Sequence, residues 1–186
     1  MTSLKLTVVL LCVVLASGCA SRVPNRSPIG ETFPTVAGES LEGQRIELPL
    51  EVRGKPAIIL VGYVQQAQFD GDRWLLGLMQ AKTPIRILEV PTIKGMVPGL
   101  FAGVIDGGMR KGIPSEDWAS VVTLYGADAS RIVEMTGNSG GSNMRVMLLD
   151  AEGRVRWFHD RGYSASKCME LDVAARHFAS LTSGTD

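Results

Sequence analysis

Residues 144–159 read MRVMLLDAEGRVRWFH and carry the clearest hairpin pattern in the chain. Its two halves, residues 144–149 and 154–159, are rich in the apolar, β-branched and aromatic side chains that strands favour. Residues 151–153 between them are Ala, Glu and Gly, as expected of a short turn that contains a glycine. The stretch therefore predicts a β-hairpin towards the C-terminal end of the chain.

The segments on either side of this hairpin predict further elements. A closing helix is expected over residues 164–181, where apolar side chains recur at helical spacing: Cys168, Leu171, Ala175 and Phe178. Before the hairpin, residues 120–125 are typical of a strand and residues 128–135 of a short helix. Residues 137–143 are rich in glycine, and we expect them to form a flexible connector into the hairpin.

The N-terminal half alternates strands with helices. Residues 57–63 (AIILVGY) are short, apolar and β-branched, which is typical of a central strand buried on both faces. A helix over residues 70–81 follows, with Asp70 placed to cap its first turn, and then a second parallel strand over residues 85–90. Two short strands are expected within residues 30–49, and another helix over residues 97–110.

This order of elements indicates the class of fold. Strands and helices that alternate early, followed by an antiparallel hairpin, predict an α/β domain with a mixed sheet. We expect helices on both faces of that sheet, with the β-hairpin and one helix closing the chain. The length of the chain suits one such domain, over residues 30–182.

The N-terminus has the layout of an export signal. Lys5 is followed by an apolar run over residues 6–15 and then by Ala-Ser-Gly directly before Cys19. The run is shorter than the roughly 20 apolar residues that a transmembrane helix needs. The small residues before the cysteine resemble the lipobox of bacterial lipoproteins. This resemblance implies cleavage after residue 18 and attachment of acyl chains, palmitate among them, to Cys19.

The chain is thus expected to comprise a signal peptide over residues 1–18, a lipidated Cys19 with a flexible tether over residues 19–29, and the folded domain. Ala20, rather than aspartate, follows the cysteine. In many Gram-negative lipoproteins this implies the outer membrane, with the domain facing the periplasm. The alternative is a plain signal peptide that happens to contain a cysteine.

The charge balance narrows the choice of partners. The chain carries 19 basic and 19 acidic residues, whereas a nucleic-acid-binding surface needs a strong basic surplus. The same balance argues against anchoring by a polybasic membrane patch. We therefore expect contact with the membrane through the N-terminal acyl chains, a protein as the further partner, and no nucleic acid.

Several short motifs resemble the thioredoxin-like superfamily, particularly its peroxiredoxin-type branch. They are Phe33-Pro34, Gly54-Lys55-Pro56 before the apolar strand, and residues 149–155. The mitochondrial ATP-synthase assembly factors, which have a degenerate thioredoxin-like fold, resemble the chain more closely. The shared residues are Phe33-Pro34, Leu41, Gly43, Leu48-Pro49, Trp74, Leu148-Leu149-Asp150 and residues 153–157. This resemblance implies a thioredoxin-like fold and a non-catalytic role in assembly at a membrane.

The active-site residues of that superfamily are absent here. Its thiol lies between the first central strand and the next helix, where the helix dipole lowers the thiol pKa. Residues 64–70 (VQQAQFD) take this place and contain no cysteine, serine or threonine, and residues 142–145 replace the usual cis-proline. We therefore expect no catalytic residue, no metal and no cofactor. The candidate residues of a groove for a peptide or partner protein are Gln65, Gln66, Gln68 and Asp70. The alternative is that they are ordinary loop side chains without a binding role.

Cys168 is the thiol that remains once the signal is removed and Cys19 is acylated. The alternative function is an atypical, peroxiredoxin-like redox enzyme that uses this thiol. The apolar stripe around Cys168 favours a place in the core instead, where a cysteine is inert. His159 and His177 do not have metal-ligand spacing. Residues 137–142 lack the Gly-Lys-Ser or Gly-Lys-Thr of a phosphate loop.

Overall fold

The computed structural model describes residues 22–94 and 99–182, so the expected signal peptide and Cys19 lie outside the described residues. Within this part of the chain, seven strands form one mixed sheet in the order β2-β1-β5-β4-β3-β6-β7. The strands are β1 (Val36–Ser40), β2 (Arg45–Leu48), β3 (Ala57–Gly62), β4 (Arg86–Ile93), β5 (Val122–Tyr125), β6 (Arg145–Leu149) and β7 (Val155–His159).

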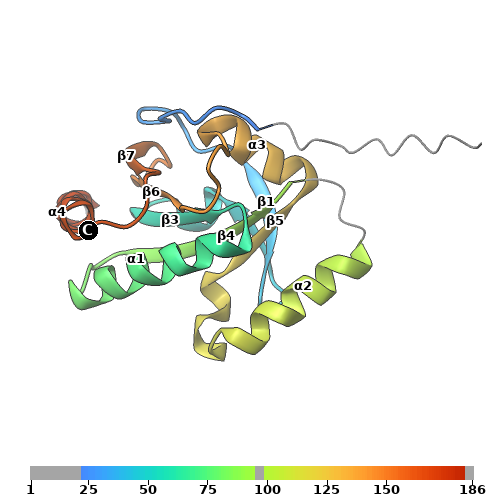
Figure 1. Cartoon of the computed structure of the whole chain (residues 1–186). Helices are drawn as coiled ribbons and strands as arrows, with labels where there is room; N and C mark the ends of the chain where they lie inside the picture. The colour runs from blue at the N-terminus through green and yellow to red at the C-terminus, as the bar shows by residue number, and fades with distance from the viewer. Residues whose placement is uncertain (1–21, 95–98, 183–186) are drawn as a thin grey trace, which may run out of the picture.

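Helices cover both faces of the sheet, as the sequence predicts (Figure 1). The α-helices are α1 (Gln68–Gln80), α2 (Gly99–Gly112), α3 (Gly126–Thr136) and α4 (Ala165–Thr182), and short 3-10 helices occur at Leu50–Val52, Gln65–Ala67 and Ser115–Ser120. Helices α1 and α4 pack on one face through Trp74, Leu78 and Leu171, and α3 packs on the other through Ala129 and Ile132. None of the described helices combines the length and apolar character needed to cross a bilayer.

Strand β3 lies inside the sheet next to its middle strand, β4, and it pairs with β4 in parallel and with β6 in antiparallel orientation. Residues 57–61 of β3 are fully buried, because helices shield the strand on both sides. Strands β6 and β7 form the predicted hairpin, and Gly153 takes a φ of 80° in its turn. Both the central strand and the hairpin are therefore confirmed.

The expected tether covers residues 19–29, of which residues 22–29 are described, and these are hydrogen-bonded to the domain. The N–H of Val23 donates to Oδ1 of Asn138 at 2.8 Å, and the Val23 carbonyl accepts from the Asn138 N–H at 3.0 Å. The segment also passes directly over Gly137, whose φ is 71°, so that a Cβ there would lie 2.2 Å from the Pro24 carbonyl oxygen. The segment is thus attached to the domain from Val23 onward. A sequence without periodicity does not reveal such bonds between distant coil segments.

The residues that follow this segment cross the outer side of β7. Gly30 donates its N–H to the Val155 carbonyl, and the Val155 N–H donates to the Glu31 carbonyl, both at 2.9 Å. Phe33 donates to the Gly153 carbonyl at the same distance and is itself buried. The start of β7 therefore has hydrogen-bond partners on both sides.

Candidate functional site

The junction between β3 and α1 is the place where a thioredoxin-like active-site thiol would lie. The chain turns there through the 3-10 helix Gln65–Ala67, in which Gln65 and Gln66 are exposed. Gln68, in the first turn of α1, donates through Nε2 to Asp72 at 2.9 Å and to Glu89 at 3.3 Å. Burial raises the pKa of the Glu89 carboxyl, although the bond from Gln68 opposes this effect. Gln68 thus faces α1 and β4 rather than open solvent.

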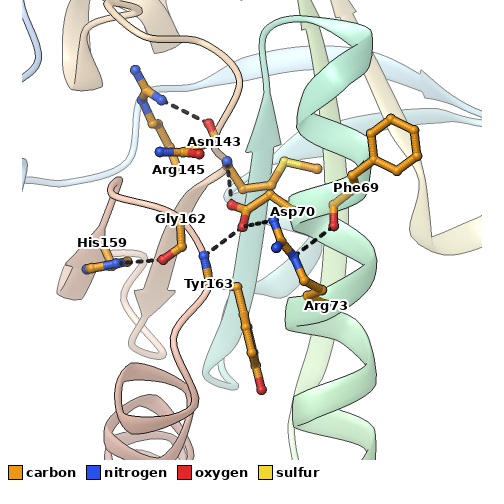
Figure 2. A network of polar contacts seen from close by, with 9 residues as sticks. Phe69, Asp70, Arg73, Asn143, Arg145, His159, Gly162 and Tyr163 are labelled. Carbon is orange, nitrogen blue, oxygen red and sulfur yellow. Dashed lines mark hydrogen bonds and ion pairs between the residues drawn. The ribbon is translucent and has the colours of Figure 1, made fainter.

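Asp70 lies in the core and not in a groove. It is the third residue of α1 and is only 1% exposed, and its carboxylate does not cap the helix as the sequence predicts. Instead, Oδ2 accepts the N–H of Met144 at 2.9 Å and Oδ1 accepts the N–H of Tyr163 at 2.6 Å (Figure 2). By accepting these two backbone N–H groups, the carboxylate joins α1 to the start of β6 and to the segment before α4.

Arg145 is a buried cation that the sequence analysis did not single out. It is fully buried, and its guanidinium donates to the Asn143 carbonyl at 2.9 Å, the Ser139 carbonyl at 2.8 Å and Oδ1 of Asn25 at 2.9 Å (Figure 2 shows the bond to Asn143). It also lies over the ring of Tyr63, 5.4 Å from the centroid. Residues 137–143 therefore wrap around a charged side chain, which corrects the expectation of a flexible connector.

Tyr63 supports Arg145 from the end of β3. Its hydroxyl makes a 2.6 Å hydrogen bond with Oγ1 of Thr136 at the end of α3. Burial raises the pKa of Tyr63 to about 12, although this hydrogen bond and the charge of Arg145 act in the opposite direction. The phenol is thus neutral at physiological pH, and it serves to hold α3, β3 and the glycine-rich loop together.

A pocket of about 470 Å³ opens at the carboxyl ends of β3 and β4. Ligand sites span roughly 300–1,000 Å³, so its size is sufficient for a small ligand or a protein side chain. Of the four candidate residues, Gln66 lines this pocket, whereas Gln65, Gln68 and Asp70 do not. Its lining also includes Arg22, Tyr63, Lys94, Asn138 and residues 140–142. The structure thus brings the N-terminal segment, the β3–α1 junction and the glycine-rich loop together.

Cys168 lies apart from this pocket. Its side chain belongs to the cluster between the sheet and helices α1 and α4, it is 4% exposed, and its Sγ would lie 2.8 Å from a Cβ added at Gly77. Burial raises the pKa of the thiol, and the nearby charge of Asp172 adds to this effect. A thiol of this kind is a poor nucleophile at neutral pH. Among the described residues, no group of three or more His, Cys, Asp or Glu side chains is placed to hold a metal.

The sheet order, the helices on both faces and the turn after β3 define a thioredoxin-like α/β domain. Solved structures share this fold across most of the chain. The thioredoxin domain of a thiol-disulfide oxidoreductase from Bacteroides vulgatus superposes with a TM-score of 0.52 at 17% identity, covering 81% of this chain and 97% of that chain. No family model matches the sequence, and the comparison with curated proteins finds no match.

Two further neighbours are lipoproteins. The exposed lipoprotein thioredoxin Etrx1 of Streptococcus pneumoniae has a TM-score of 0.51 at 12% identity, covering 76% of this chain and 99% of that chain. A SCO1/SenC family lipoprotein from Bacillus anthracis has a TM-score of 0.51 at 11% identity, covering 84% and 99%. At such identities the likeness shows a common fold, and the function must be argued from this chain's own residues.

Proposed function

We propose that the chain is a non-catalytic, thioredoxin-like binding or assembly factor that acyl chains on Cys19 hold at the cell envelope. The observation that carries this proposal is the β3–α1 junction. Gln65–Ala67 occupy the place of the family's nucleophilic thiol, and a pocket lined by Gln66 opens beside them. A glutamine donates and accepts hydrogen bonds but supplies neither a nucleophile nor an acid, so the site suits recognition.

The state of the remaining thiol supports a role without catalysis. A peroxidatic or disulfide-exchanging cysteine needs access and a lowered pKa. Cys168 is buried and its pKa is raised, and it packs beneath α1 instead of lining the pocket. The alternative, an atypical redox enzyme that uses Cys168, would require the thiol to become exposed through a separation of α1 from α4.

The place of action follows from the N-terminal sequence. Ala-Ser-Gly before Cys19 supports cleavage and lipidation, and Ala20 supports the outer membrane with the domain facing the periplasm. The two structural neighbours that are lipoproteins by name fit this placement. The partner is a protein at that membrane. A kinship in role with the mitochondrial ATP-synthase assembly factors, which act without catalysis, is part of the proposal.

Site-specific crosslinking on native membranes tests the binding role. A photo-reactive amino acid replaces Gln66 at the pocket or, as the control, exposed Lys55 before the opposite end of β3. We expect one partner to be captured reproducibly from position 66 and not from position 55. Peroxide and disulfide turnover are measured on the same protein and on Cys168→Ala. No position-dependent capture, together with turnover that Cys168→Ala abolishes, would replace the proposal with the redox enzyme.

A further inference from the structure

We propose that the pocket beside the β3–α1 junction binds the anionic phosphate head group of a phospholipid in the membrane that carries the anchor. The inference rests on the proposed acylation of Cys19 and deepens the binding role. Two features lead to it: the charge of the pocket, and the short length of chain between the pocket and the acylated residue.

The described lining of the pocket carries positive charge and hydrogen-bond donors. Arg22 and Lys94 belong to it, and none of the described residues that line it is an aspartate or glutamate. The amide of Asn138 and the hydroxyl of Ser142 lie in the same lining. No hydrogen bond within the described residues uses the backbone N–H groups of residues 140–142. Guanidinium, ammonium, hydroxyl and free N–H groups together are the donors that recognise a phosphate oxygen.

The wall that carries these donors is preorganised. The guanidinium of Arg145 fixes the shape of the loop, because it donates hydrogen bonds to the Ser139 and Asn143 carbonyls. Figure 2 shows the bond to Asn143. The Tyr63 ring below Arg145 is tied in turn to Thr136 by its hydroxyl. Because Arg145 engages the carbonyl groups of the loop, a ligand need not order this segment when it binds, which lowers the cost of binding.

The distance along the chain selects a lipid as the source of the phosphate. Arg22 lines the pocket and lies three residues after Cys19, so their Cα atoms can be at most about 11 Å apart. Val23 is hydrogen-bonded to Asn138, which also lines the pocket. The polar layer of a bilayer is about 5–8 Å deep on each side. A pocket held this close to acylated Cys19 lies at the head groups, whereas an 11-residue tether would have allowed it to stand well away from them.

The acylated protein, reconstituted in vesicles, provides the test. A series of phosphatidylcholine vesicles is prepared with increasing fractions of phosphatidylglycerol. In each sample, hydrogen exchange measures the protection of the backbone amides of residues 139–143. We expect protection to rise with the phosphatidylglycerol fraction. Lys94→Gln or Arg22→Gln should raise the fraction needed for half-maximal protection about fivefold, as expected for one basic residue near an anionic surface. Lys55→Gln, which removes the same charge before the far end of β3, should leave it unchanged.

Each other outcome has a distinct meaning. Protection by inorganic phosphate in pure phosphatidylcholine vesicles, without an effect of phosphatidylglycerol, would overturn the lipid source, and so would equal protection in both kinds of vesicle. Protection that appears only when the crosslinked protein partner is added would assign the pocket to that partner. Intact mass is measured first. A protein without acyl chains on Cys19 refutes the proposed anchoring, whereas an acylated protein with an unprotected loop refutes the lipid site alone. Unchanged exchange of β3 in the variants shows that they fold.

Discussion

Replacement of Arg145 by methionine should destabilise the domain by about 3 kcal/mol. Methionine keeps an unbranched apolar side chain but removes the guanidinium, which also lies over the Tyr63 ring. The bonds lost are those to the Asn143 carbonyl at 2.9 Å, the Ser139 carbonyl at 2.8 Å and Oδ1 of Asn25 at 2.9 Å. A hydrogen bond from a charged donor contributes about 1.5–3 kcal/mol. The net effect is smaller than the sum of three, because methionine is easier to bury and the loop carbonyls regain some water.

Urea unfolding followed by tryptophan fluorescence measures this change, since Trp74 and Trp157 lie in the core. Arg53→Met is the matched control. Arg53 is exposed, so the same substitution should change the free energy of unfolding by less than about 0.5 kcal/mol. If Arg145→Met and Arg53→Met cost the same, Arg145 does not organise the glycine-rich loop, and the pocket wall is not preorganised by it.

Three other predictions concern separate parts of the chain. Burial alone would raise the pKa of Asp150, but hydrogen bonds from the Arg154 N–H and the Arg156 guanidinium lower it overall. The stability this carboxylate contributes is therefore present above its unfolded-state pKa and lost as the pH falls through its folded-state pKa. Asp150→Asn should lower the free energy of unfolding by about 1–2 kcal/mol at pH 7. In urea titrations, the free energy of unfolding of the variant should also fall less steeply below about pH 4. Cys168 should react with a maleimide on the order of a hundredfold more slowly in the native than in the unfolded protein. Gly137→Ala should cost about 2 kcal/mol in thermal unfolding and speed tryptic cleavage of the segment that crosses it.

The controls for these three tests also come from the chain. Asp128→Asn changes a half-buried carboxylate that pairs with Arg131 at the surface, so it should leave the acid dependence of unfolding nearly unchanged. Gly112→Ala adds a Cβ that meets nothing within 4 Å, so it should not affect cleavage of the N-terminal segment. Native Cys168 that reacts as fast as the unfolded thiol would contradict its burial and would support the redox alternative.

The elements that the sequence predicts correctly depend on local patterns. Residues 57–63 are apolar without interruption, and the hairpin at residues 144–159 combines two strand-like runs with a glycine turn, so neither requires knowledge of distant residues. Strand β3 and the β6–β7 hairpin occur where these patterns place them. The helix predicted over residues 70–81 begins at Gln68, because a 3-10 turn leads into it without a capping side chain.

The site depends on contacts that no local pattern reveals. Asp70 bonds to Tyr163, 93 residues away, and Arg145 bonds to Asn25, 120 residues away. Spacing alone suggested a helix cap for Asp70. Arg145 gave one signal that could have been used: it is a charged residue at the start of an otherwise apolar strand, and a charge in such a place must find partners. Its partners could not be named without the fold.

The strip of residues 30–33 along β7 has a consequence for the proposed anchoring at a membrane. A bare edge strand can pair with the edge of another molecule, and this risk grows with local concentration. Lipid-anchored molecules share a plane and meet one another far more often than the same number free in solution. Gly30 and Glu31 are hydrogen-bonded to the carbonyl and the N–H of Val155. These two backbone groups at the start of β7 are therefore not available to a strand of another molecule. With Cys19 acylated as proposed, this cover would keep the start of β7 from pairing with a strand of an identical copy beside it.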